Sequence, residues 1–187
     1  STINEKAFHL TTLTENYLYK DGLSFNLVKN SQKVRELLIA LALQVGSEVS
    51  YLELANTVGV DRKTIEYYLD LLEKSFVIFR INGFSRNLRS EISRKVKIYF
   101  YDLGIRNSLI NNQNSLAFRN DIGALWENLM VAEKKKQENF IGNKLSLYFW
   151  RTYDQQEIDL IEDKGGMLSA FEFKYSPKTV KIPIGWK

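Results

Sequence analysis

The segment from Glu157 to Lys174 constrains the fold more than any other stretch of the chain, because polar and apolar residues alternate on both sides of a glycine pair. Alternation with a period of two is typical of β-strands, whose successive side chains point to opposite faces. Gly165 and Gly166 can adopt the positive φ angles that tight hairpin turns require. The sequence therefore predicts two antiparallel strands joined by a short turn.

The length of that turn decides which polar side chains face each other across the hairpin. A four-residue loop makes Asp159 and Glu172 diagonal neighbours, whereas a two-residue loop places them directly opposite each other. Either even-length loop brings Asp159, Glu172 and Lys174 to one face, and an odd-length loop or a bulge would separate them. The sequence leaves the loop length open.

Two interpretations of this polar face are open. Neighbouring carboxylates repel each other, so a face that carries them either stays in water or binds a cation. Mg²⁺ (or Mn²⁺) suits carboxylate oxygens, and a nearby lysine can orient an attacking water or stabilise charge that develops on a phosphate. The alternative is an ordinary amphipathic hairpin whose charged face is solvated.

Composition narrows the class of protein. With 187 residues, 44% of them hydrophobic, the chain can fill one large or two small cores. It contains no cysteine, which excludes disulfides and thiolate metal sites and fits a cytoplasmic protein. No apolar run approaches the roughly 20 residues of a membrane-spanning helix, so we expect no membrane partner. The sequence opens without methionine, and we expect residues 1–30 to be the tail of an upstream domain.

Residues 31–110 are predicted to form a winged-helix domain. Ser31, Ser50 and Asp61 can each cap the start of a helix, and apolar residues follow each of them at helical spacing. A short helix, a glycine turn and a capped helix over about residues 62–74 make up a helix-turn-helix arrangement. A β-hairpin is expected to follow as the wing.

The wing is predicted from two apolar segments, 76–81 and 95–101, with a tight turn at Asn82-Gly83. Residues 74–106 carry eight basic and two acidic residues, a net charge of +6, whereas the whole chain carries +4. Basic side chains neutralise phosphates, so we expect weak, salt-sensitive contact with duplex DNA. The candidate nucleic-acid-binding residues are Arg62, Lys63, Arg86, Arg89, Arg94 and Lys95.

Protein docking is the alternative role for this domain. Winged helices also bind proteins, and a basic loop is often simply solvated. Glu66 and Asp70 lie on the same outer face of the predicted helix as Arg62 and Lys63, and acidic side chains do not favour contact with the major groove.

A second, small α/β domain is predicted over residues 116–187, after a polar linker. Its first helix, from residue 122 to about 137, is apolar over most of its surface, so we expect it to be buried between other elements. Glu127 lies within this helix, where a carboxylate is costly unless it is paired or bound to a cation. It either joins the polar face of the hairpin, pairs with Lys134 or reaches water. A strand at 145–151 leads into the hairpin.

The order of these elements resembles the PD-(D/E)XK nuclease fold, in which a helix with a glutamate precedes a hairpin that carries an acidic residue and then (D/E)-x-K. The matching positions are Glu127, Asp159 and Glu172-Phe173-Lys174. The resemblance implies that Glu127, Asp159 and Glu172 hold Mg²⁺ or Mn²⁺, that Lys174 orients the nucleophile, and that Glu157 supports the ligands without touching the ion. Such a core usually continues with another helix and strand, so residues 178–187 are either a remnant of that region or the fold is truncated.

Both halves together resemble the C-terminal half of a family of bacterial and archaeal AAA+-type ATPases, in which a P-loop domain precedes a region of unassigned function. The matching segments are Tyr17–Asp21, 49–81, Tyr99–Asn107, Gly123–Asn128, Tyr148–Thr152, Glu157–Asp159 and Phe171–Lys174. The resemblance implies an upstream ATPase domain in the same polypeptide, which would bind the ATP. No G-x-x-x-x-G-K-[ST] occurs in this sequence, so ATP hydrolysis is not assigned to these residues.

Three hypotheses for function follow. The chain is a metal-dependent nuclease-like module that a winged helix directs to nucleic acid, or a non-catalytic module that docks DNA or protein. In the third hypothesis both domains are a sensor that regulates the upstream ATPase, through assembly into homo-oligomers. The sequence leaves open whether the intact protein is an enzyme.

Overall fold

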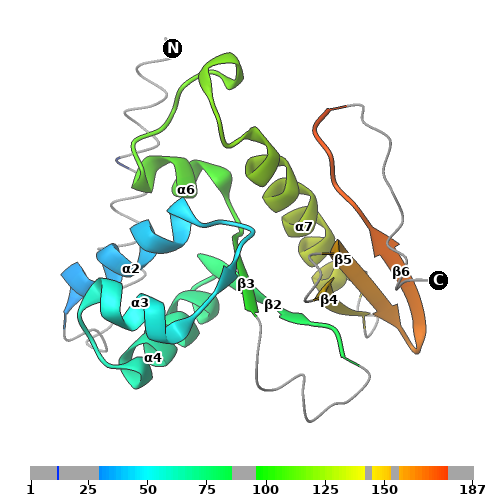
Figure 1. Cartoon of the computed structure of the whole chain (residues 1–187), viewed down its shortest axis with the longest axis horizontal. Coiled ribbons are helices and arrows are strands. Elements are labelled where there is room, and N and C mark those ends of the chain that lie inside the picture. Colours follow the sequence, from blue (N-terminus) through cyan, green and yellow to red (C-terminus); the bar gives the residue numbers. More distant parts are fainter. Residues whose placement is uncertain (1–11, 13–29, 86–95, 142–144, 153–155, 177–187) are drawn as a thin grey trace. The chain divides into compact units, whose positions relative to one another are not determined.

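The computed structural model describes residues 12, 30–85, 96–141, 145–152 and 156–176, with the backbone alone for 138–141 (Figure 1). It has a mixed α+β fold in which the chain divides into two compact units. The first unit takes its described residues from 1–45, 49–79 and 100–119, and the second from 46–48, 80–99 and 120–187. The units are not contiguous in sequence, and the predicted domains 31–110 and 116–187 stay a prediction.

Helices make up most of the first unit. They are α2 (Ser31–Leu43), α3 (Tyr51–Val58), α4 (Arg62–Lys74), α6 (Leu103–Leu109) and the short 3₁₀ helix η2 (Leu116–Phe118). Ser50 and Asp61 cap α3 and α4 as predicted, each through a side chain that accepts a backbone N–H. The cap predicted at Ser31 is wrong by one residue, because Asn30 accepts the N–H of Lys33 at 3.2 Å and Ser31 begins the helix.

The core of this unit consists of the apolar residues that recur at helical spacing. The large side chains of α2 and α4 that are fully buried are Val34, Leu37, Leu38, Leu41, Ile65, Leu69 and Leu72. Burial of each such side chain stabilises the fold by about 1.5–3 kcal/mol. The predicted inner faces of these two helices are therefore confirmed.

The turn predicted at Asn82-Gly83 is wrong. Both residues belong to strand β2 (Ile78–Gly83), where Asn82 pairs with Tyr148 and Gly83 with Phe149 in a parallel ladder. The Phe84 N–H continues this pairing by donating to the Phe149 carbonyl at 2.6 Å. A partner strand distant in sequence has overridden the local turn preference.

The strands next to that segment are close to those predicted. Strand β2 begins at residue 78 rather than 76, and the return strand β3 covers Val96–Phe100. Residues 86–95 lie outside the described part of the chain, and with them four predicted DNA contacts: Arg86, Arg89, Arg94 and Lys95. The connection between β2 and β3 is therefore not described beyond residue 85.

One six-stranded sheet has the order β1-β3-β2-β4-β5-β6. Its other strands are β1 (Glu48–Val49), β4 (Leu145–Arg151), β5 (Glu157–Lys164) and β6 (Met167–Phe171). Strand β5 pairs antiparallel with β4 on one side and with β6 on the other. The strand predicted at 145–151 and the hairpin after it are confirmed. Lys164 pairs with Met167, so the hairpin has the two-residue loop.

Helix α7 (Ile122–Ile141) belongs to the second unit and extends four residues beyond the predicted end. Leu125, Val131 and Ala132 are buried, whereas Leu129 is 39% exposed, so the helix is not buried all round as predicted. No helix among the described residues is long and apolar enough to span a membrane.

Candidate functional site

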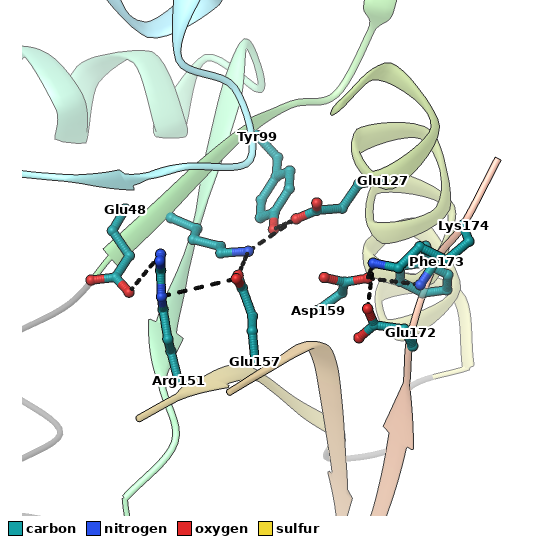
Figure 2. A network of polar contacts seen from close by, with 10 residues as sticks. Glu48, Tyr99, Glu127, Arg151, Glu157, Asp159, Glu172, Phe173 and Lys174 are labelled. Atoms are coloured by element: carbon teal, nitrogen blue, oxygen red, sulfur yellow. Dashed lines mark hydrogen bonds and ion pairs between the residues drawn. The ribbon is translucent and has the colours of Figure 1, made fainter. Parts of the chain in front are cut away.

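The end of the β5–β6 hairpin holds Asp159 in a buried position. Leu160 pairs with Phe171, and the same register places Asp159 opposite Glu172, the residue that follows β6. Asp159 is 5% exposed, and its Oδ2 accepts the backbone N–H of Phe173 at 2.7 Å (Figure 2). The hydrogen bond fixes the segment after β6 against β5, so the E-x-K residues lie beside the aspartate.

Lys174 joins the two carboxylates of this hairpin end. Its Nζ lies 4.0 Å from Asp159 Oδ2 and forms an ion pair with Glu172 (Figure 2). The bond to Glu172, and after it the charge of Asp159, raises the pKa of Lys174, so the lysine is charged at neutral pH. The three side chains lie together as predicted, but β6 ends at Phe171, so Glu172 and Lys174 follow the strand instead of belonging to it.

The charge of Asp159 is disfavoured at this position. Burial raises the pKa of Asp159 to about 6, and the negative charge of Glu127 adds to the shift. The amide of Phe173 and the charge of Lys174 act in the opposite direction, and Glu172 raises the pKa further. The charged form of Asp159 is therefore destabilised chiefly by burial and, after it, by the negative charge of Glu127.

Glu127 reaches the same region from α7 and is held by three neighbours. Its Oε1 accepts from the Tyr99 hydroxyl at 2.7 Å and from Lys97 Nζ at 3.1 Å. A Cβ on Gly46, where φ is +76°, would lie 3.3 Å from the same oxygen, so only glycine leaves room for the carboxylate without a shift. The alternative partner Lys134 instead pairs with Glu162 at 2.9 Å.

Lys97 connects Glu127 to Glu157. The lysine is 1% exposed, and its Nζ lies 2.6 Å from Glu157 Oε1 as well as 3.1 Å from Glu127 Oε1. Burial alone would lower the pKa of Lys97, but the charges of Glu127 and Glu157 outweigh it and raise the pKa. Burial, followed by the charge of Glu127, also raises the pKa of Tyr99, so its hydroxyl stays protonated as a donor.

Arg151 extends the network from Glu157 to Glu48. This arginine lies 4.0 Å from Glu157 Oε2 through its Nε and 3.5 Å from Glu48 Oε1 through its Nη1 (Figure 2). The acidic network consists of two clusters of ion pairs, and the negative charge of Glu127 in the first acts on Asp159 in the second. The first cluster is Glu48, Glu127, Glu157, Lys97 and Arg151, and the second is Asp159, Glu172 and Lys174. The formal charge of the whole network is −2 when every carboxylate is ionised, and all of its members belong to the second unit.

The predicted site residues Glu127, Glu157, Asp159, Glu172 and Lys174 are thus all members of one network. Within the described ranges, no three His, Cys, Asp or Glu side chains are grouped closely enough to hold a metal ion. Lysine and arginine lie between several of the carboxylates instead. The three-carboxylate metal site therefore stays a prediction.

Sequence reasoning missed Lys97 and Tyr99. Both are members of β3, which was predicted as part of a basic wing, and Lys97 was counted among the charges available to DNA. A lysine inside an otherwise apolar strand, V-K-I-Y-F, was the signal that could have identified it. Of the predicted DNA contacts that the structure describes, Arg62 and Lys63 are exposed at the start of α4, where Arg62 pairs with Glu66 at 2.9 Å.

Comparison with known proteins places the chain in a family without assigned activity. Residues 1–116 match the domain of unknown function DUF8612, and the chain belongs to this family. Residues 122–182 match the domain of unknown function DUF4143, which is found in C-terminal regions associated with AAA ATPases. The second match agrees with the family context that the sequence resemblance implied.

Two curated relatives are similar over most of this chain. They are "Uncharacterized protein Mb2031c" of Mycobacterium bovis and "Uncharacterized protein Rv2008c" of Mycobacterium tuberculosis. Each is 28% identical over 168 residues, which cover 89% of this chain and 36% of the relative. The chain therefore spans about a third of the length of these relatives. No solved structure matches it.

Proposed function

We propose that the acidic network is a divalent-metal-dependent site for cleavage of nucleic-acid phosphodiesters, in the C-terminal region of an AAA+-type ATPase whose winged helix contacts DNA. The observation that carries the proposal is the excess negative charge around Asp159, a buried carboxylate with Lys174 beside it. A divalent cation would bring the formal charge of the network from −2 to zero.

The donor set fits Mg²⁺ or Mn²⁺. Mg²⁺ is usually held by one or two carboxylates and keeps several waters, so Asp159 and Glu172 suffice as protein ligands. Glu127 is the third candidate, although one of its oxygens already accepts from Lys97 and Tyr99. When bound, the ion would polarise a phosphate oxygen and make water a better nucleophile.

The chain's own residues have separate roles in this proposal. Lys174 supplies a positive charge next to the ligands, where it can orient a water or stabilise charge on the phosphate. The Phe173 N–H holds the Asp159 carboxylate in place. Glu157 acts at a distance, because it contacts Lys97 and Arg151 rather than the hairpin carboxylates.

Thermal unfolding with and without metal tests the proposal. Millimolar Mg²⁺ or Mn²⁺ should raise Tm, because a ligand that binds only the folded state stabilises it by mass action. Asp159→Asn should abolish the rise, and Mn²⁺-dependent cleavage of plasmid DNA should be lost with it. Glu133→Gln removes an exposed carboxylate of α7 and serves as the matched control. No shift of Tm in the unmodified chain would contradict a metal site.

A non-catalytic docking module is the second candidate. It is favoured by the ion pairs of Glu127, Glu157 and Glu172, each of which already has a lysine partner inside the network. In this case the network holds the fold together, and the chain binds DNA or a protein and regulates the upstream ATPase. The absence of any metal effect, together with DNA binding at low salt, would favour this candidate.

A further inference from the structure

We propose that the Lys97 ammonium is a built-in cation, which occupies the position between Glu127 and Glu157 that a second metal ion would otherwise take. The inference rests on the proposed function, because it states how many metal ions the site can hold. Its consequence is a site for a single divalent ion, on Asp159 and Glu172. Lys97 is then a positioning residue, which acts through the two glutamates it contacts.

The first support is the geometry around the lysine. Its Nζ lies 3.1 Å from Glu127 Oε1 and 2.6 Å from Glu157 Oε1, and these carboxylates come from α7 and β5. A cation that joins carboxylates from two separate elements has the position of a bridging metal. The Phe149 ring, 5.4 Å from Nζ to its centroid, covers the lysine on another side.

Burial is the second support. Lysine is almost never fully buried unless its charge is paired, and Lys97 is 1% exposed with two anionic partners. Tyr99 and Gly46 confine the same Glu127 carboxylate, by a hydrogen bond of 2.7 Å and by close approach of the backbone. The lysine therefore has a built position rather than an incidental surface contact.

Charge balance is the third support. The network carries −2, so one divalent ion neutralises it, and a second ion would leave +2 around the buried Lys97 and Asp159. An unpaired charge at a buried position is strongly disfavoured. The ammonium of Lys97 already supplies the positive charge between Glu127 and Glu157.

The experiment counts Mn²⁺ ions bound to the whole chain, by calorimetric titration and by electron paramagnetic resonance of the free ion. The unmodified chain should bind one ion, and Lys97→Met should bind one more, because Glu127 and Glu157 then lack their cation. Lys97→Arg keeps the charge and should bind one, as should Lys97→Met combined with Glu157→Gln. A Lys97→Met protein with the same number and affinity of ions as the unmodified chain would overturn the inference.

The numbers of Mn²⁺ ions bound by these variants distinguish failure of the inference from failure of the proposed function. If the unmodified chain binds no Mn²⁺ but Lys97→Met binds one, the proposed metal site on Asp159 is wrong and the assignment of Lys97 stands. If the unmodified chain binds one ion that Asp159→Asn removes, and Lys97→Met binds no further ion, the proposed metal site on Asp159 stands and the assignment of Lys97 is wrong. If the Lys97→Met protein is unfolded without metal, addition of Mn²⁺ should restore its far-ultraviolet circular dichroism. Lack of recovery counts against the inference.

Discussion

Asp159 has a charge that the folded protein accommodates poorly, since it is 5% exposed and lies near other carboxylates. Burial, and after it the charge of Glu127, raises the pKa of Asp159 from 3.8 to about 6. Between these values the folded chain keeps a proton that the unfolded chain has released. The free energy of unfolding therefore falls as the pH rises from about 4 to about 6, and it stays at the lower level above that range.

Asp159→Asn should therefore stabilise the metal-free protein at neutral pH. The amide oxygen can still accept the Phe173 N–H, and the disfavoured charge is gone. A pKa shift of roughly two units corresponds to at most about 3 kcal/mol in the free energy of unfolding. This stabilisation of the variant should fade below about pH 4. Urea unfolding in the presence of a chelator, across this pH range, measures the difference.

The control for this measurement is Glu133→Gln, which removes an exposed carboxylate from α7. Its stability relative to the unmodified chain should not change with pH in the same range. Equal stability of Asp159→Asn and the unmodified chain at about pH 7.5 would show that the charge of Asp159 has no cost.

The residues that the β5–β6 hairpin contributes to the site could be predicted from the sequence, whereas the residues that β3 contributes could not. Side chains two apart on a strand share a face, so Asp159, Glu172 and Lys174 come together for either even-length turn. The partners of Glu127 come from β3, about thirty residues earlier in the chain. Neither hydrophobic periodicity nor a local motif indicates that Lys97 contacts a glutamate on a helix so distant in sequence.

Among the secondary-structure elements, the two glycine-containing turn signals had different outcomes. Gly165 and Gly166 have φ angles of +62° and +90° and form the predicted hairpin turn. Asn82-Gly83 continues β2, because β4 supplies a hydrogen-bonding partner for it. Hairpins depend on neighbours in sequence, so they can be predicted locally, whereas this parallel ladder depends on a strand 66 residues away.

This difference predicts opposite effects of valine at the two positions. Asn82→Val should change the free energy of unfolding by less than about 1 kcal/mol or raise it, because Asn82 is exposed in a strand and valine favours strands. Gly165→Val should destabilise the protein by about 1–2 kcal/mol or more, because a β-branched residue is strained at positive φ. Chemical unfolding of both variants gives the comparison. A large decrease in the free energy of unfolding for Asn82→Val would contradict this expectation.

For the whole molecule, the structure reduces the positive charge that is available to a partner. Two of the eight basic residues between positions 74 and 106, Lys97 and Arg106, are buried at 1% and 3% exposure. Lys97 is paired with glutamates, and Arg106 donates to the Ala42 carbonyl at 2.8 Å. Any DNA contact of this region therefore depends on the remaining basic residues, chiefly those of residues 86–95.

Replacing Arg86, Arg89 and Arg94 with alanine should weaken binding to duplex DNA and flatten its salt dependence. Each lost phosphate contact lowers the slope of log K against log salt by about 0.9, so loss of three contacts lowers it by about 2.7. Fluorescence anisotropy with a labelled duplex at several salt concentrations gives the slope. Alanine at Lys135, Lys136 and Lys164 removes the same charge from α7 and β5 and should leave the slope nearly unchanged. Equal slopes for both triple variants would mean that net charge, rather than a contact at 86–95, drives binding, and no binding even at low salt would favour protein docking.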